Sequence, residues 1–291
     1  MRISPHTTQR MAWVAMWAAA FIAVAVLLFI IGYVFARGIP RLSLDFVFGA
    51  SSYGGMGGGL RTPIIGSLYL TLLTLVLVVP FGVGASVYLA EYAPHGRFSQ
   101  LVRYGTDTLA GVPSIVFGMF GFAFFVVILL NGRMSILAAA FSLACLNLPF
   151  MVGAAEEAIR TVPQTQREAA LALGATKWQT IRQVVLPRAM PGIITGVILC
   201  AGIAMAETAP LLLTLRLTPF IPSSPLDSCE TLTLRLLDLA MWKPSIGGVT
   251  RQDLFAQALA VGVILIIIIV VLNFLARWIS QRYIARMTGE R

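Results

Sequence analysis

The sequence predicts an all-α integral membrane protein with six transmembrane helices, folded as a single domain over residues 1–291. Of the 291 residues, 58% are hydrophobic and 11% are charged, and the mean hydropathy is +0.87. Such a chain lacks the polar side chains that cover a water-soluble globule. Its apolar residues gather in runs of about 20, which is long enough for a helix to cross hydrocarbon. The runs do not show the ten-residue alternation of a membrane β-barrel.

Six apolar segments meet the length that a transmembrane helix requires. Helices are expected in all of them, because hydrocarbon offers no water to bond open backbone groups. The segments are residues 12–35, 66–91, 109–130, 135–156, 189–211 and 254–276. The first is too long for the apolar core of a cleavable signal peptide, so we expect it to remain as a span.

The Lys and Arg residues set the expected orientation of these spans. Of the 21 basic residues, 13 fall on the side that holds both termini and 8 fall on the opposite side. Because cytoplasmic loops are enriched in Lys and Arg, we expect both termini to be cytoplasmic. Residues 212–253 carry no net charge and are expected to form a long extracytoplasmic loop that can receive a partner.

Composition argues against several other classes of protein. The net charge of +9 follows from arginines on the inner loops, so it does not indicate a nucleic-acid-binding protein. The cysteines imply no disulfide framework: Cys145, Cys200 and Cys229. We find no metal-ligand or nucleophile–base set, so we expect neither a metal site nor an enzyme. Neither of the two lysines, Lys177 and Lys243, is followed by Ser or Thr, so the chain has no Walker A motif.

A polar, alanine-rich stretch lies between the fourth and fifth spans. It includes "EAALALGATKWQTIRQVVLP", residues 168–187. Pro163 suits the first turn of a helix, and Thr165 and Glu168 have the spacing of a capping box. Gly174 is a natural residue to follow the end of this helix. We therefore expect a short helix that ends at Gly174 on the inner face of the membrane.

A second short helix is expected directly after the first. Thr176 and Gln179 repeat the capping-box spacing. Three apolar side chains recur at helical spacing and predict a stripe on one face: Trp178, Ile181 and Val185. Pro187 is expected to end this helix and to lead into the fifth span.

The residues leave two interpretations of this hairpin open: it docks on a polar partner, or it rests on lipid headgroups. Its charged side chains Arg167, Glu168 and Arg182 can face such a partner. The hairpin resembles the EAA motif of ABC-importer permeases at Glu168, Ala169, Ala170, Gly174, Val184, Leu186 and Pro187, with Val184 where that family usually has Ile. The resemblance implies a type I importer permease of the MetI-like fold. It also implies that residues 160–187 are a cytoplasmic coupling-helix segment on partner ATPase subunits, which bind ATP and Mg²⁺.

Four further stretches resemble the phosphate-importer permeases of the PstA type. They are "GGGLRTPIIGSLYLTLLT" (57–74), "VYLAEYAP" (87–94), "LAGVPSIVFGMFG" (109–121) and "ETAPLLLT" (207–214). This resemblance implies import of inorganic phosphate across a bacterial or archaeal plasma membrane. It also implies three kinds of partner: a sister permease of the PstC type, a dimer of ATPase subunits of the PstB type and an extracytoplasmic phosphate-binding protein of the PstS type.

Two of these stretches hold candidate residues of a substrate pathway. Gly111 and Pro113 precede a helix start at Ser114, where free backbone N–H groups and a hydroxyl favour an anion. The alternative there is a hinge without ligand contact. Glu207, followed by Thr208, is the acidic residue placed deepest along a span, and carboxylates at such depth are costly and suggest function.

Glu207 allows three interpretations. Its carboxylate can accept a hydrogen bond from the proton that phosphate retains near neutral pH and that sulfate lacks, it can pair with a cation such as Arg216, or it can reach water at the outer interface. In the fourth span, Asn147 and Pro149 either line a water-filled path or mark a structural kink. Two glycines are expected to permit close helix packing: Gly118 and Gly121.

The chain departs from some relatives at two intramembrane positions. Gly153 and Ile203 stand where those relatives carry arginines. Either another subunit supplies the positive charge, backbone dipoles and hydroxyls hold the anion, or the cargo differs. Sulfate or molybdate is therefore the alternative cargo. A stand-alone secondary transporter is a further alternative, although the sequence shows no internal repeat.

Overall fold

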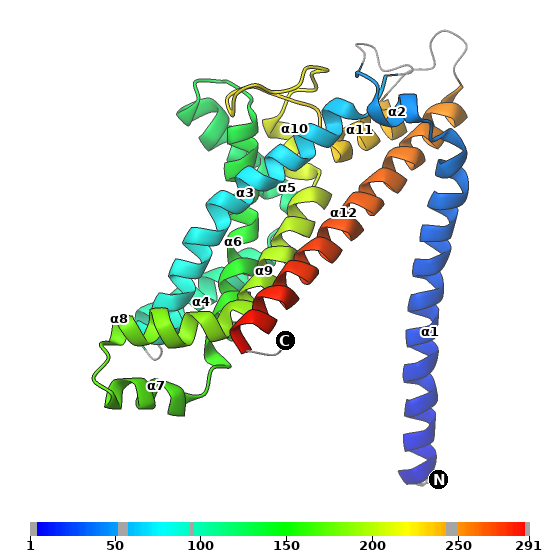
Figure 1. Cartoon of the computed structure of the whole chain (residues 1–291). Coiled ribbons are helices and arrows are strands. Elements are labelled where there is room, and N and C mark those ends of the chain that lie inside the picture. Colours follow the sequence, from blue (N-terminus) through cyan, green and yellow to red (C-terminus); the bar gives the residue numbers. More distant parts are fainter. Residues whose placement is uncertain (1–4, 52–57, 94–95, 243–249, 289–291) are drawn as a thin grey trace.

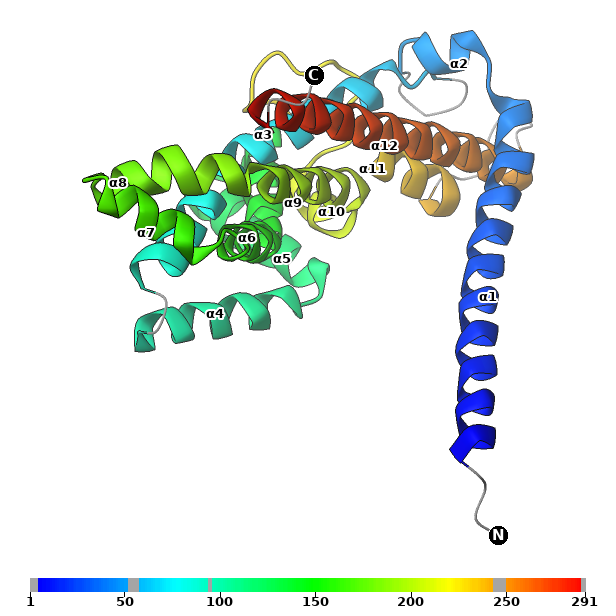
Figure 2. The ribbon, with the colours of Figure 1, turned by 60° about the horizontal axis from the view of Figure 1, so that its bottom comes forward.

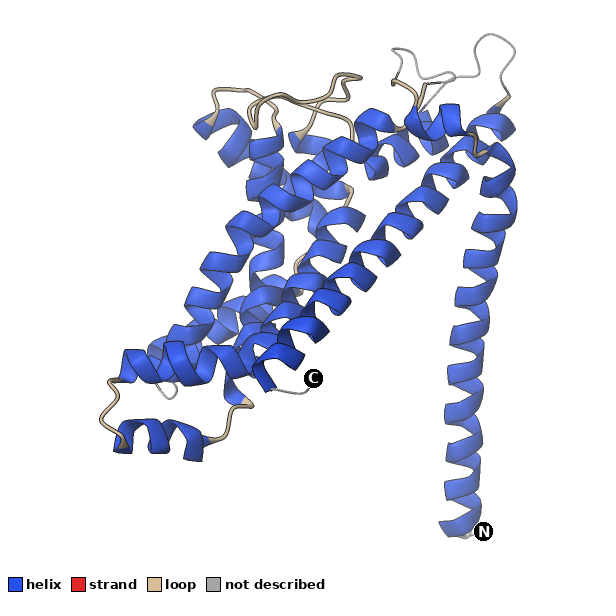
Figure 3. Ribbon diagram, viewed as in Figure 1, coloured by secondary structure: helices blue, strands red, loops and turns tan. Residues whose placement is uncertain are grey.

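The computed structural model describes residues 5–51, 58–93, 96–242 and 250–288. Within these ranges every regular element is a helix and no strand occurs (Figures 1 and 3). The all-α fold class is therefore confirmed. Parts of three stretches discussed above lie outside the described residues: residue 57, residue 94 and residues 243–249.

Within the described residues, five helices have the length and apolar composition to cross a membrane. Each occupies one of the predicted segments, with its ends shifted by a few residues or more. They are α1 (Pro5–Gly38), α3 (Arg61–Val87), α6 (Ile136–Arg160), α9 (Leu186–Ala206) and α12 (Arg251–Thr288). The start of α1 and the end of α12 lie toward the same end of the molecule, as expected for two termini on one side (Figure 1).

The prediction for the third span, residues 109–130, is wrong at its start. α4 (Arg97–Ala110) and α5 (Ser114–Phe120), which continues as a π-helix (Gly121–Leu129), form a pair bent by 105°. Pro113 has no backbone N–H and disfavours helical backbone in the residue before it, so the helix breaks there. Counted as one span, the bent pair supplies the sixth crossing. α4 lies at the end of the bundle where α9 begins (Figure 2).

The core lies where α3, α6 and α9 pack against one another. α6 is the most buried span, with 61% of its most apolar window covered by the rest of the chain. Small residues set the distance between these helices. A Cβ added at Gly192 of α9 would lie 2.5 Å from Cβ of Ala158 in α6, and one added at Gly82 of α3 would lie 2.5 Å from Cγ of Met151. The three helices therefore approach as closely as their glycines allow.

α1 stands apart from this core in both views (Figures 1 and 2). It meets α12 near its outer end, where Gly38 lies against Leu259 and Val263. None of its most apolar window is buried by the described part of the chain. Its apolar side chains therefore face lipid or another subunit. A 3-10 turn (Ile39–Arg41) and α2 (Leu44–Phe48) follow α1 on the way to α3.

The outer segment is more structured than the sequence predicts. The fifth span, expected at 189–211, ends at Ala206, and α10 (Ala209–Thr214) follows it. Residues 212–253, expected as a long loop, also contain α11 (Leu232–Leu237) and a π-helical turn (Asp238–Trp242). The segment between the fifth and sixth spans therefore contains short helices, while its extracytoplasmic location stays a prediction.

Polar contacts hold the outer segment in place. Arg235 Nη1 donates to Glu230 Oε1 at 3.2 Å, and both side chains are almost completely buried. The Asp227 carboxylate accepts hydrogen bonds from the hydroxyl and N–H of Ser223 and from the N–H of Ser224. These bonds favour the charged form and lower the pKa of Asp227. Specific hydrogen bonds and an ion pair therefore order this segment, which lies at the end of the molecule opposite to the start of α1.

The close contact at Gly192 predicts different effects for two glycine substitutions in α9. Gly192→Ala places a methyl group against Ala158, so we expect the free energy of unfolding to fall by about 1–3 kcal/mol. Gly202→Ala has no atom within 4 Å of the added carbon. It should leave stability unchanged or raise it by up to about 1 kcal/mol, because alanine favours a helix more than glycine does. Equal melting temperatures for the two variants in detergent would contradict the described packing.

Candidate functional site

The stretch between α6 and α9 folds into a helical hairpin at the inner end of the bundle. Its first arm is α7 (Gln164–Ala172). Its second arm, α8 (Lys177–Thr180), continues through a π-helical turn (Ile181–Val185) into α9. α7 projects beyond α8 and the inner ends of the neighbouring spans (Figure 1). The two short helices expected within residues 160–187 are therefore present.

Gly174 makes the turn between the two arms. Its φ of +85° lies in the left-handed region, which glycine adopts at no steric cost. The Gly174 N–H donates to the Leu171 carbonyl at 3.0 Å, and the Ala175 N–H donates to the Ala170 carbonyl at 3.2 Å. These are the paired hydrogen bonds of a Schellman motif. The prediction that Gly174 follows the end of the first helix is confirmed.

The two predicted capping boxes have different outcomes. The Thr176 hydroxyl accepts from the Gln179 N–H at 3.3 Å, and the Thr176 N–H donates to the Gln179 side chain at 2.7 Å, so this box is confirmed. The box predicted for Thr165 and Glu168 is wrong. Pro163 occupies the N-cap position and offers no side-chain acceptor, which places Thr165 inside the first turn.

The expectation that Pro187 ends the second arm is wrong. The Leu186 N–H donates to the Ile181 carbonyl, five residues back, and the helix continues from this π-helical turn through Pro187. Pro187 is the second residue of α9, and the π-helical turn directly before it accommodates its missing N–H. Ile181 and Val185 are buried as predicted, but Trp178, assigned to the same stripe, is 55% exposed. Residues 177–206 form one continuous helix.

The residues of the EAA-like motif divide into two groups. Glu168, Ala169 and Gly174 are exposed at the tip of the hairpin, beside the exposed side chains of Leu171 and Leu173. The other four are half-buried in the arms or at the joint with α9: Ala170, Val184, Leu186 and Pro187. Exposed apolar side chains gathered in this way are typical of a protein interface. The tip is therefore suited to receive a partner protein, and the joint holds the hairpin to the spans.

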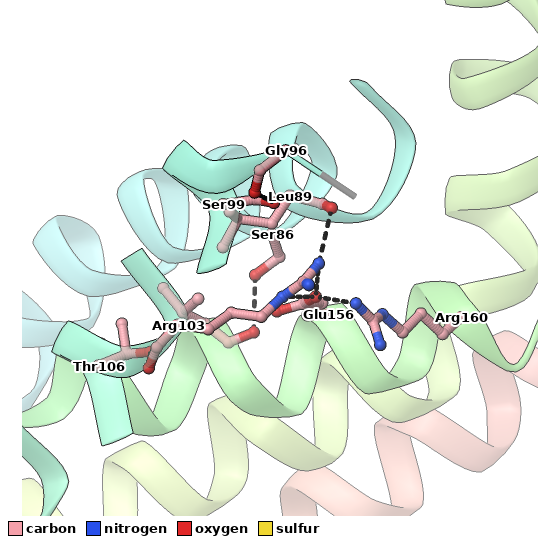
Figure 4. A network of polar contacts seen from close by, with 9 residues as sticks. Ser86, Leu89, Gly96, Ser99, Arg103, Thr106, Glu156 and Arg160 are labelled. Atoms are coloured by element: carbon pink, nitrogen blue, oxygen red, sulfur yellow. Dashed lines mark hydrogen bonds and ion pairs between the residues drawn. The ribbon is translucent and has the colours of Figure 1, made fainter. Parts of the chain in front are cut away.

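Two sets of ion pairs fasten the inner ends of the spans, and neither was predicted from the sequence. Arg103 of α4 pairs with Glu156 of α6 at 2.8 Å, and Glu156 also pairs with Arg160 at 2.7 Å (Figure 4). Arg167, expected to face a partner, turns inward and pairs with Glu91 at 2.8 Å. The sequence shows only that these charged residues stand at or near the ends of apolar runs. That position does not identify the residue with which each of them pairs.

A second candidate site lies between α9 and α10, where Glu207 is extended. α5 packs on α10 beside this break. A Cβ added at Gly118 would lie 2.9 Å from Cα of Pro210, and one added at Gly121 would lie 2.4 Å from Oγ of Ser142. The close packing predicted for both glycines is confirmed, and it brings α5 next to the break at Glu207.

Glu207 and Thr208 are both half-buried at this break. The carbonyl of Glu207 accepts a hydrogen bond from the Thr233 hydroxyl at 3.3 Å. No described residue bonds to its carboxylate, so the pairing with Arg216 is not formed. Among the described residues, no group of three or more His, Cys, Asp or Glu side chains is placed to hold a metal ion. The carboxylate of Glu207 is thus available to a ligand or to another subunit.

The predicted residues at the start of α5 lie one helical turn from this packing contact. Ser114 begins α5 and is half-buried, while Gly111 and Pro113 are exposed in the bend. No side chain caps the free N–H groups there. The start of α5 and the Glu207 break therefore belong to one region.

Gly153 and Ile203 are the positions at which some relatives carry arginines. Gly153 is exposed with open space around it, and Ile203 is half-buried.

Asn147 is separate from this region. It is fully buried, and the Cys200 thiol of α9 donates to its carbonyl at 3.8 Å. Its amide donates to the Leu143 carbonyl at 2.9 Å, while its Oδ1 atom has no partner. α6 remains helical through Pro149. A water-filled path along Asn147 would require α6 and α9 to separate.

Similarity to known proteins agrees with this geometry. The family model described as "Binding-protein-dependent transport system inner membrane component" matches residues 82–285. The "Probable ABC transporter permease protein YqgI" of Bacillus subtilis is 37% identical over 287 residues, which cover 94% of each chain. "Phosphate transport system permease protein PstA 2" of Mycobacterium bovis is 32% identical over 91% of this chain and 88% of its own. "Phosphate transport system permease protein PstA" of Haemophilus influenzae is 37% identical over 64% of this chain and 65% of its own.

Solved structures of two ABC transporters share the fold. A chain of the MetNI methionine ABC transporter has a TM-score of 0.62 at 18% identity and covers 77% of this chain and 95% of its own. A chain of a bacterial ABC transporter involved in alginate import has a TM-score of 0.68 at 17% identity, with coverage of 94% and 96%. At these identities the likeness concerns the fold alone. The family match spans more than half of the chain, and the chain therefore belongs to the binding-protein-dependent transport system inner membrane components, the permease subunits of ABC importers.

Proposed function

We propose that the chain is the PstA-type permease subunit of an importer of inorganic phosphate. Two signals support the proposal. Relatives at 32–43% identity bear the name of phosphate transport permeases, and two of the stretches that resemble that type, residues 109–121 and 207–214, pack together through α5 and α10. The proposed partners are a PstC-type sister permease, a dimer of PstB-type ATPase subunits and a PstS-type phosphate-binding protein. The complex works in the plasma membrane of a bacterium or an archaeon.

Coupling to ATP is assigned to the hairpin. In this proposal ATP and Mg²⁺ bind to the partner ATPase subunits, and the exposed tip at Glu168, Ala169 and Gly174 seats against them. The partly buried joint, Val184 to Pro187, keeps the tip in a fixed position relative to α9. Closure of the ATPase dimer then pushes the tip, and the spans attached to it move as bodies.

The anion is proposed to pass the region shared by α5 and Glu207. The first residues of α5 offer backbone N–H groups without a side-chain cap, Ser114 adds its hydroxyl, and Thr208 offers a second hydroxyl. The carboxylate of Glu207, which no described residue bonds, accepts a hydrogen bond from the hydroxyl that phosphate retains near neutral pH. Fully ionised sulfate has no such hydroxyl, so Glu207 favours phosphate. Asn147 contributes only in a state in which α6 and α9 have moved apart.

Uptake of labelled phosphate by the reconstituted complex tests the cargo. We expect uptake to require ATP and to be abolished by unlabelled phosphate, but not by sulfate or molybdate at the same concentration. The binding protein is titrated alone with the same anions, because its specificity can dominate uptake. Equal competition by sulfate or molybdate would favour the alternative oxyanion. Uptake without ATPase subunits would identify a secondary transporter.

The left-handed turn predicts a graded effect of substitutions at Gly174. Gly174→Val places a branched side chain on a backbone with φ of +85°, which costs about 1–2 kcal/mol even though the surrounding space is open. Gly174→Asn is the matched control, because Asn tolerates this conformation better. We expect the Val variant to co-purify with less ATPase subunit and to lose most ATP-driven uptake. Equal ATPase retention in both variants would show that the turn does not control docking.

Glu207→Gln removes the charge of the proposed acceptor and keeps its shape. We expect phosphate uptake to fall by about five- to tenfold, because a charged acceptor bonds more strongly than a neutral one by about 1–1.5 kcal/mol. Subunit content and melting temperature should not change. Glu157→Gln, at an exposed position of α6, is the control and should leave uptake unchanged. Wild-type uptake in the Glu207 variant would remove this residue from the pathway.

A further inference from the structure

The inner end of α3 meets the hairpin through two side-chain contacts. The last turn of α3 widens into a π-helix over Tyr88–Tyr92, and Glu91 and Tyr92 both lie in this turn. Such turns occur frequently at functional sites. Glu91 contacts one arm of the hairpin and Tyr92 contacts the other, so the two arms are attached to α3 independently.

Glu91 reaches the first arm through Arg167. Nε and Nη2 of Arg167 donate to Oε1 of Glu91 at 3.0 and 2.8 Å. Arg167 also donates to the carbonyl of Ile159, at the inner end of α6, at 2.9 Å, and to the carbonyl of Val162, two residues after that helix ends. The side chains of Arg167 and Glu91 are only 13% and 10% exposed. One guanidinium therefore joins α3, α6 and α7 where little water competes for its hydrogen bonds.

Tyr92 reaches the second arm through Lys177, the first residue of α8. The Lys177 Nζ atom lies 4.7 Å from the centroid of the Tyr92 ring, which is within the range of a cation–π contact. Lys177 and Arg167 lie on opposite sides of the turn at Gly174. The inner end of α3 thus holds both arms of the hairpin.

We propose that the Glu91–Arg167 ion pair, supported by Tyr92 and Lys177, makes α3 move together with the coupling hairpin. This inference rests on the proposed function, in which the hairpin receives force from an ATPase. The chain itself joins α6 and α9 to the hairpin, whereas α3 is held to it by side chains alone: these polar contacts and the apolar cluster that Val87 shares with Ile181 and Val185. A guanidinium suits the task because its fork fixes orientation as well as distance. Glu91 and Arg167 are therefore positioning residues.

The cavity beside this contact supplies a matched control. It has a volume of about 800 Å³, and both Arg160 and Arg167 line it. Arg160 pairs with Glu156 on its own helix and is 51% exposed. Arg160→Gln therefore removes an arginine from the same cavity and leaves the contact between Glu91 and Arg167 intact.

The test compares Glu91→Gln, Arg167→Gln and the double variant in the complete reconstituted complex. The measurements are ATP hydrolysis with the phosphate-loaded binding protein, phosphate uptake per ATP hydrolysed, and melting temperature with subunit content. We expect each single substitution to lower uptake per ATP by about 2- to 30-fold, the range produced by residues that carry coupling. The double variant should be no worse than Arg167→Gln, because both changes act through one contact. Arg160→Gln should match the wild type.

Two results would overturn the proposal. One is wild-type uptake per ATP in both single variants. The other is a parallel fall of uptake, hydrolysis and melting temperature at constant uptake per ATP, which is what a purely structural ion pair predicts. Failure of the proposed function is distinguishable from both, because the wild-type complex itself would then show no ATP-driven phosphate uptake.

Discussion

The requirement that main-chain polar groups be hydrogen-bonded inside hydrocarbon governs this structure. It makes every crossing a helix and limits where a helix can stop. The main interruptions near the ends of the apolar segments lie at residues 111–113, at Glu207 and at the hairpin. Side chains inside the bundle bond to main-chain carbonyls as well, as where the Ser142 hydroxyl donates to the Phe117 carbonyl at 2.7 Å. The candidate functional residues therefore sit where the helical pattern is broken and polar groups become available.

The same requirement explains which parts of the fold were predictable. The signal for a span is the combined hydropathy of about 20 residues. The location of each span is therefore clear in the sequence, although its ends are not. The turn at Gly174 and the cap at Thr176 were predictable because their signals are local. Pro113 and Pro187 show the limit of such signals. The first breaks a helix, and the second is accommodated by a π-helical turn that the sequence did not indicate.

The contacts that fasten the inner ends were beyond prediction for a different reason. Arg103 is 53 residues from Glu156, and Arg167 is 76 residues from Glu91. Pairing over such separations depends on how the spans pack, and packing depends on shape along whole helices. At the candidate pathway, the sequence identified Glu207 but not that its carboxylate has no partner among the described residues. Asn147 was plausible by composition, yet it lies inside the contact between α6 and α9.

The second arm of the hairpin and α9 form one unbroken helix from Lys177 to Ala206, so a movement of the hairpin can be transmitted to the opposite face of the membrane. The 30 residues of this helix make a rod about 45 Å long, at about 1.5 Å per residue. If such a rod pivots near its inner end by about 5°, its outer end sweeps about 4 Å, more than the reach of a hydrogen bond at about 3.2 Å. In the proposed function, a rotation too small to disturb side-chain packing at the pivot is thus enough to make or break a hydrogen bond between Glu207 and a passing ion.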